Sequence, residues 1–258
     1  MLRRHRLGYW LCCISLAMLL PVVVVGKEVV RAVFMEDFPP LSFTDRQKAN
    51  GMLVEQVEYL VEQSLGMQLE VKTYPWKRAQ RLVEAGEADI FYTVETEARR
   101  QYAWFVKRPM YRIQLALLAS AHNKRLDEIE QIRHLQDLEG FSITSYRGDG
   151  WSAQNLQQFP LLWMNGAQDA LRAVDRGLAD ICIGNIPTLT AQLRTYGGRD
   201  RFVMVPLPDL TPTRPEFRIG VSQRALGASQ LLEDLNRALE KAEVQQKLRE
   251  IEERWHEK

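Results

Sequence analysis

The chain has 258 residues, 46% hydrophobic and 26% charged, which are ordinary globular values that exclude collagen-like, low-complexity and disordered chains. Three cysteines are too few for a disulfide scaffold, and four scattered histidines form no zinc-binding pattern. The formal net charge is +1, but beyond residue 26 the chain carries 31 basic and 33 acidic side chains. Because nucleic-acid binding needs a basic excess to neutralise phosphates, that class is excluded.

The first 26 residues have the pattern of an export signal. Arg3, Arg4 and Arg6 form a basic stretch, and residues 7–25 carry no charge. A basic stretch before an apolar run is typical of a secretory signal peptide, so we predict cleavage after Gly26 and a periplasmic location. The alternative is an uncleaved N-terminal anchor, because 19 uncharged residues nearly span a bilayer.

The chain after this segment alternates between strand and helix patterns. The first strands are predicted at residues 29–35, 69–74 and 88–93, with helices over 53–65 and from Trp76 to the glycine at position 86. Strands that alternate with helices favour a parallel sheet with crossover helices. The first part of the chain is therefore predicted to be α/β.

The same order of elements recurs in the second half. Strands are predicted at residues 141–145, 161–164 and 179–184, with helices over 151–158 and 167–176. Residues 83–90 (VEAGEADI) and 174–181 (VDRGLADI) also share letters at a constant offset of 91. Such helix–glycine–strand junctions look alike in many α/β proteins, which is the alternative explanation. The matching order of the flanking elements favours two similar lobes.

Further elements define the predicted domain order. A strand is predicted at residues 112–120, between the repeats, and strands at 202–207 and 217–221 are followed by amphipathic helices. We predict residues 27–112 as the first part of lobe 1, 113–207 as lobe 2, and 208–258 as a return to lobe 1. Each lobe is predicted to hold a mainly parallel sheet flanked by helices. Two chain crossings predict a two-strand hinge and a cleft between the lobes.

A series of short motifs points to a protein family. In chain order they are Phe38-Pro-Pro-Leu-Ser-Phe-Thr44, Gly51, Gly86-Glu-Ala-Asp89, Thr96-Glu-Ala-Arg99, Tyr102-Ala-Trp-Phe105, Leu138-Glu-Gly-Phe-Ser-Ile-Thr and Gly177-Leu-Ala-Asp180. Their order resembles that in the extracellular (periplasmic) solute-binding proteins of family 3, the polar-amino-acid type, over nearly all of residues 27–258. The resemblance implies a type II periplasmic-binding-protein-like fold. It also implies a clamp that closes on a small polar solute, an amino acid or related carboxylate, for an ABC importer.

The resemblance places Arg99 where the family's arginine binds a ligand carboxylate. A guanidinium matches a carboxylate with two parallel hydrogen bonds and stays charged. Arg99 follows the strand that ends near Thr93, so it is predicted at the carboxyl end of the sheet, where open α/β folds bind ligands. The alternative is a solvated arginine beside Arg100.

Neighbouring residues are candidates for further ligand contacts. Tyr92 and Thr93 end the same strand and could supply a hydroxyl or a backbone donor. Val94 stands where the family often has a hydroxyl residue, so contacts at this place are expected from the main chain or from Glu95.

The remaining candidates in the first lobe are aromatic residues and one arginine. The family places a side chain that faces the cleft near Trp76, where an indole could stack on a ring or cover an aliphatic stem. A place in the core is the alternative for Trp76, because aromatic side chains are mostly buried. Arg78 follows within a turn, and Phe38 and Phe43 lie on the first loop.

Two second-lobe residues bear on the charge of the ligand. The resemblance implies that the turn at residues 145–150 closes over a carboxylate, and Asp149 in it is either a helix cap or a ligand contact. Asn185 stands where amino-acid binders of the family often have an acid for the ligand's ammonium, and an amide supplies no charge. Either Glu95 or Asp149 supplies that charge, or the ligand is not an ordinary α-amino acid.

Two other functional classes were weighed against transport. The chain has no Gly-x-Ser-x-Gly, no His-Glu-x-x-His and no Cys–His pairing, so an enzyme is not expected, although catalysis by a carboxylate such as Glu95 stays open. The same clamp could instead report a solute to a separate membrane receptor. We expect a monomer without cofactor or metal, whose partner is an inner-membrane permease or a sensor.

Overall fold

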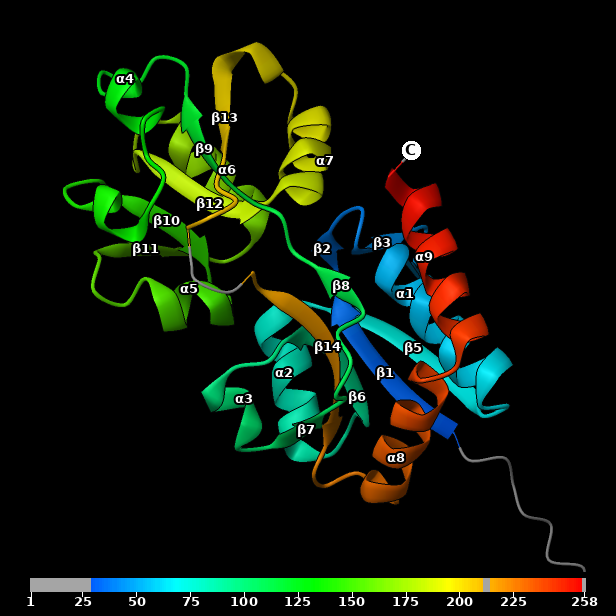
Figure 1. Cartoon of the computed structure of the whole chain (residues 1–258). Coiled ribbons are helices and arrows are strands. Elements are labelled where there is room, and N and C mark those ends of the chain that lie inside the picture. Colours follow the sequence, from blue (N-terminus) through cyan, green and yellow to red (C-terminus); the bar gives the residue numbers. More distant parts are fainter. Residues whose placement is uncertain (1–28, 211–213, 257–258) are drawn as a thin grey trace, which may run out of the picture.

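A computed structural model describes residues 29–210 and 214–256. The predicted signal peptide, residues 1–26, lies outside the described residues. Figure 1 shows two lobes, each with a sheet flanked by helices. The predicted α/β class is confirmed. None of the helices described is both long and apolar enough to cross a membrane.

The first lobe contains the N-terminal strands and the C-terminal helices. Its main sheet has the order β5 (Gln68–Tyr74), β1 (Val29–Met35), β6 (Ile90–Val94), β14 (Glu216–Ser222) and β7 (Ala103–Phe105), and β8 (Tyr111–Arg112) also pairs with β14. A small second sheet holds β2 (Asp37–Phe38), β3 (Ser42–Asp45) and β4 (Lys48–Asn50). The helices are α1 (Met52–Glu58) with its π-helical extension η1 (Tyr59–Ser64), α2 (Trp76–Ala85), α3 (Glu97–Arg100), α8 (Ala228–Leu239) and α9 (Ala242–His256).

The second lobe is built on the middle of the chain. Its sheet has the order β11 (Leu161–Met164), β10 (Ile143–Tyr146), β12 (Ile181–Asn185), β9 (Leu115–Ser120) and β13 (Phe202–Pro206). Around it lie α4 (Leu126–Ile129), η2 (Leu135–Leu138), α5 (Gly150–Asn155), α6 (Ala167–Asp175), α7 (Ile186–Tyr196) and η3 (Arg199–Arg201).

Both sheets are mixed, whereas mainly parallel sheets were predicted. The neighbours β5, β1 and β6 are parallel, as are β11, β10 and β12, but β14 and β9 run antiparallel to their neighbours. The reason lies in the chain path. After each crossing between the lobes, the chain enters a sheet through β9 or β14, which therefore begins near the crossing. The parallel strands of the same sheet end near the crossing, so β9 and β14 run antiparallel to them.

The strand predicted over residues 112–120 is two strands in different sheets. β8 pairs antiparallel with β14 in the first lobe, and β9 pairs with β12 and β13 in the second. Between them the backbone N–H of Ile113 donates to the carbonyl of Pro215 at 2.9 Å, so the two crossing segments lie side by side. Ile113 and residues 115–119 are buried as the chain passes from one core to the other, while Arg112 and Gln114 are exposed.

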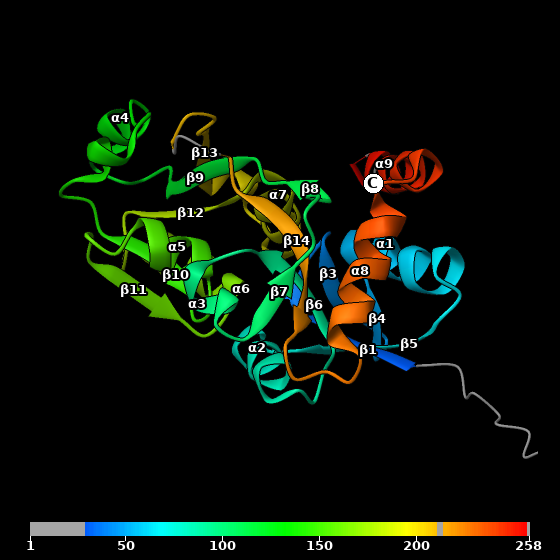
Figure 2. The same ribbon diagram turned by 60° about the horizontal axis from the view of Figure 1, so that its bottom comes forward.

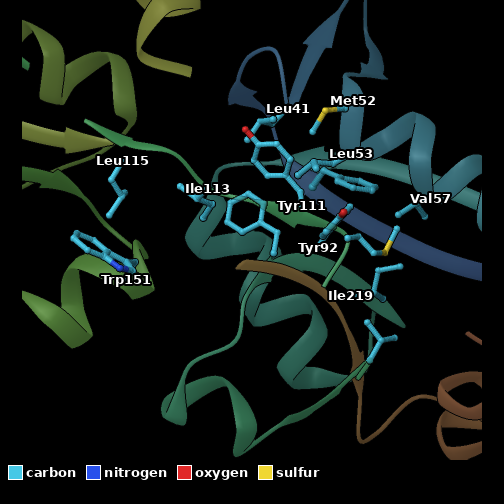
Figure 3. Close-up of a cluster of buried hydrophobic side chains, with 14 of the residues drawn as sticks. Leu41, Met52, Leu53, Val57, Tyr92, Tyr111, Ile113, Leu115, Trp151 and Ile219 are labelled. Carbon is cyan, nitrogen blue, oxygen red and sulfur yellow. The ribbon is translucent and has the colours of Figure 1, made fainter. Parts of the chain in front are cut away.

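The first sheet has two covered faces. Tyr92 and Ile90 pack toward α1, α8 and α9, whereas Phe91, between them on β6, packs toward α2. Figure 2 shows α2 on one side of the sheet and α1, α8 and α9 on the other. The larger apolar cluster extends from Tyr92 and Ile219 through Ile113 in the crossing segment to the second lobe (Figure 3). This packing fixes the carboxyl end of β6 beside the gap between the lobes.

Candidate functional site

A small cavity of about 40 Å³ lies between the two lobes. Its wall contains the carboxyl end of β6, the start of α2 and the turn from β10 to α5. The aromatic side chains in the wall are Phe38, Trp76, Tyr92, Tyr146, Trp151 and Phe217, and the polar ones are Ser42, Thr93, Arg99 and Asp149.

Arg99 is the cation of this cavity. It lies on the four-residue helix α3, whose N-cap Thr96 accepts a hydrogen bond from the backbone N–H of Arg99 at 3.3 Å. The side chain is directed into the gap, where Nη1 donates to the carbonyl of Val94 at 2.6 Å and Nε donates to Oε1 of Gln80 at 3.4 Å. Only 3% of the residue is exposed. The solvated alternative therefore describes the neighbour Arg100 instead, which pairs with Glu95 on the surface.

Arg99 is buried without a carboxylate partner. None of the ion pairs in the described part of the chain includes it. Burial lowers the pKa of its guanidinium, while Tyr102 and Asp149 nearby oppose that shift. An arginine remains protonated in spite of such a shift. The cavity therefore contains a positive charge that no protein carboxylate neutralises by direct contact.

The carbonyl oxygen of Gly148 connects the lobes at the cavity. It accepts hydrogen bonds from Nε1 of Trp76 at 2.9 Å, Nε2 of Gln80 at 3.1 Å and Nη2 of Arg99 at 3.0 Å. All three donors belong to the first lobe, whereas Gly148 belongs to the turn between β10 and α5 of the second. A φ of +93° at this turn residue suits glycine. The first-lobe donors thus hold the second-lobe turn over the cavity.

Trp76 and Thr93 both border the cavity. The indole of Trp76 is stacked on Phe91 at 6.1 Å between ring centroids, and its exposed fraction is 8%. Trp76 is therefore part of both the first-lobe core and the cavity wall. Each of the two alternatives from the sequence describes one of these roles. Thr93 is buried at the end of β6.

Tyr92 offers the cavity its ring but not its hydroxyl. The hydroxyl donates to Oε1 of Gln56 at 2.9 Å in the core between β6 and α1. Complete burial raises the pKa of Tyr92 well above its ordinary value. The hydroxyl of Tyr92 is thus directed away from the cavity, because its ring extends past the wall to Gln56 in the core.

Asp149 borders the cavity and caps α5. Its Oδ1 accepts from the backbone N–H groups of Trp151 at 3.1 Å and Ser152 at 3.3 Å. Its Oδ2 accepts from the hydroxyls of Ser145 at 2.8 Å and Ser152 at 2.6 Å. The helix-cap alternative is the one that the structure shows.

Four predicted site residues lie outside the wall of this cavity: Glu95, Arg78, Phe43 and Asn185. Glu95 pairs with Arg100 at 2.7 Å and with Arg218 at 3.6 Å. The guanidinium of Arg78 lies 4.8 Å over the ring of Tyr74. Phe43 meets Trp255 edge-on, at 6.3 Å between ring centroids.

Asn185 lies at the crossing between the lobes, not in the cavity wall. Its Oδ1 accepts from the backbone N–H of Gln114 at 3.1 Å, and its Nδ2 donates to the hydroxyl of Tyr111 at 3.1 Å. Burial raises the pKa of Tyr111 to about 12, although its hydrogen bond with Asn185 acts in the opposite direction. An amide suits this buried place because it both donates and accepts without carrying a charge.

Sequence reasoning missed several residues that the structure brings together. Gln80 follows Trp76 by four positions, so both side chains lie on the same face of α2, and this spacing was the signal for it. Tyr146 and Phe217 come from different lobes and meet Phe38 at 6.3 Å each, which no local pattern predicts. Within the described ranges no group of three or more His, Cys, Asp or Glu is placed to hold a metal ion.

Comparisons with known proteins agree on the family and the fold. Residues 30–258 match the bacterial extracellular solute-binding proteins, family 3. No curated protein matches the chain. An ancestral arginine-binding protein bound to arginine is 20% identical, with a TM-score of 0.72 over 89% of this chain and 98% of that one.

Two further solved structures have the same fold. The substrate-binding protein of an amino acid ABC transporter is 18% identical, with a TM-score of 0.72 over 89% of this chain and 100% of that one. A histidine kinase sensor domain with similarity to periplasmic binding proteins is 20% identical, with a TM-score of 0.74 over 89% and 96%. The predicted periplasmic-binding-protein-like fold is confirmed, and the chain belongs to the bacterial extracellular solute-binding proteins of family 3.

Proposed function

We propose that this chain is a periplasmic protein that captures a small polar solute, an amino acid or related carboxylate, between its lobes for an ABC importer. The observation that carries the proposal is Arg99, a buried cation without an ion pair in the wall of an interlobe cavity. A ligand carboxylate would supply the missing partner. Arginine, glutamine and a transported amino acid are named for proteins of the same fold, which supports this solute class.

A thermal-shift screen of residues 27–258 against amino acids, organic acids and amines tests the proposal. A ligand at 100 times its Kd stabilises a protein by about 2.7 kcal/mol through mass action. For a chain of this size that corresponds to a rise in Tm of roughly 5–10 °C. Failure of every solute in the screen to raise Tm would contradict the proposal.

Ligand sensing is the second candidate, because a histidine kinase sensor domain and a domain of Bordetella pertussis BvgS share the fold. Deletion of the gene separates the two functions. Transport predicts loss of uptake of the labelled solute found in the screen, whereas sensing predicts unchanged uptake with an altered transcriptional response to that solute. Catalysis receives no support, since Glu95 pairs with Arg100 and Arg218 outside the cavity wall.

Capture requires that residues 27–112 with 208–258 move as one body relative to residues 113–207. Gly150 tests this motion, since a Cβ there would lie 2.8 Å from Cζ of Arg99 in the opposite lobe. Alanine is a better helix former than glycine, so α5 itself tolerates the change. Overpacking costs about 1–3 kcal/mol, so we expect Gly150→Ala to weaken solute binding about 5- to 150-fold. Calorimetry measures this affinity.

The control for Gly150→Ala is Gly166→Ala at the start of α6. A Cβ at Gly166 would lie 3.8 Å from Oδ2 of Asp37, an ordinary contact, so its affinity should remain near that of the wild type. Small-angle scattering should show that wild type contracts on saturation with the solute and that Gly150→Ala contracts less. Equal affinity and equal contraction in both variants would contradict the clamp.

Export gives a separate prediction. Val24 and Gly26 are small or modest residues before the predicted cleavage point, so the secreted protein should begin within a few residues of Lys27. N-terminal sequencing of the periplasmic fraction measures this start. An intact Met1 on a membrane-bound product would instead support the uncleaved anchor.

A further inference from the structure

We propose that the solute is a carboxylate with an aromatic or similarly flat apolar body and no ammonium group. This inference rests on the proposed function and narrows its ligand class. It follows from the charged groups and the aromatic side chains in the cavity wall.

The cavity provides a cation for a carboxylate. Arg99 is 3% exposed and has no carboxylate partner within the described residues. The protein's own oxygens accept from Nε, Nη1 and Nη2, one hydrogen bond each. A side-chain hydrogen bond with Tyr102 is a fourth contact. Because a guanidinium has five N–H groups, one donor remains beyond these four contacts.

The described cavity wall offers no unpaired carboxylate for an ammonium. Asp149 is the carboxylate in the wall, and its two oxygens already accept four hydrogen bonds from Ser145, Trp151 and Ser152. A carboxylate has about four lone-pair positions, so these donors fill them. The carbonyl of Gly148 already accepts three hydrogen bonds. An ammonium brought here would lose hydration without an unpaired carboxylate to compensate its charge, which is costly.

Other groups that could hold an ammonium lie elsewhere. Glu95 is paired with Arg100 and Arg218 in a neighbouring cavity, and Oδ1 of Asn185 accepts from the backbone N–H of Gln114 at the crossing. Neither contributes to the wall of the cavity that contains Arg99. An α-amino acid would therefore find a cation for its carboxylate but no unpaired carboxylate for its ammonium.

The rest of the wall is suited to an apolar ring. Phe38, Trp76, Tyr146 and Phe217 surround the space with aromatic faces from both lobes, and the hydroxyl of Tyr92 is directed into the core. Flat apolar groups gain offset-stacked or edge contacts from such rings beyond their burial. A short chain between ring and carboxylate would let both ends reach their partners.

The test compares four probes that share parts of one skeleton, measured by calorimetry on residues 27–258. The probes are 3-phenylpropionate, L-phenylalanine, 2-phenylethylamine and propionate. We expect 3-phenylpropionate to bind at least about 10-fold more tightly than L-phenylalanine, because only the latter must bury an ammonium. Neither 2-phenylethylamine, which lacks the carboxylate, nor propionate, which lacks the ring, should reach saturation at the same concentrations.

A pair of matched variants locates the binding. Phe38→Leu should weaken 3-phenylpropionate about 2- to 10-fold because a wall ring is lost. Phe43→Leu should leave the affinity unchanged, since Phe43 packs on Trp255 outside the wall.

L-phenylalanine that binds as tightly as 3-phenylpropionate, propionate that binds equally well, or no binding of 3-phenylpropionate would each overturn the inference. The proposed function would survive any of these outcomes if another solute of the broad screen binds to saturation and loses affinity in Arg99→Ala.

Discussion

Replacement of Arg99 by alanine is expected to lower the affinity for the tightest-binding carboxylate of the screen by about 30-fold to several-thousand-fold. The physical reason is that one partner of a buried charge pair is removed, which costs roughly 2–5 kcal/mol. Arg99→Lys should also bind poorly, because an ammonium cannot reproduce two parallel hydrogen bonds. Calorimetry measures the affinities, and circular dichroism checks that each variant is folded.

Two controls separate the carboxylate contact from other roles of Arg99. Arg100→Ala should retain wild-type affinity, because Arg100 is exposed and pairs with Glu95 outside the cavity wall. Gln80→Ala removes a donor to the carbonyl of Gly148 but no charge, so its loss should be much smaller. Equal affinity of Arg99→Ala and wild type would show that no carboxylate binds at this place. Equal losses in Arg99→Ala and Gln80→Ala would assign the effect to the contact between the lobes.

Local periodicity was sufficient for most of the fold because each lobe alternates buried strands with amphipathic helices. Strand direction was less accessible, since β9 and β14 become antiparallel only through the path of the chain between the lobes. The run at residues 112–120 shows the same limit. Most of its residues are apolar, yet β8 and β9 pair in different sheets.

The candidate site divides in a similar way. Thr93 lies near the end of β6, and Arg99 and Asp149 follow the ends of β6 and β10. Element order therefore places all three near the cavity. The surroundings of Glu95 and Asn185 depend on Arg218 and Tyr111, which are distant in sequence and come from other elements. Sequence spacing therefore identified residues at strand ends, and it could not identify which of them already had partners within the protein.

Phe91 is the residue whose truncation should most affect stability. It is 1% exposed and packs against Trp76, Tyr102 and Phe105 at 5.9 to 6.1 Å between ring centroids. Phe91→Ala should lower the free energy of unfolding by about 3–5 kcal/mol, because removal of the ring creates a cavity between β6 and α2. Urea unfolding of residues 27–258 without ligand measures this loss.

Gly220 provides a second test of how the Phe91 ring packs. It pairs with Phe91 across β6 and β14, and a Cβ there would lie 2.2 Å from Cε1 of the Phe91 ring and 3.0 Å from Cε1 of Phe105. Gly220→Ala alone should therefore cost about 1–3 kcal/mol through overpacking. Because leucine leaves room for the new methyl group, Phe91→Leu combined with Gly220→Ala should be more stable than the sum of the single losses predicts. Strictly additive losses in urea unfolding would show that the glycine does not accommodate the ring.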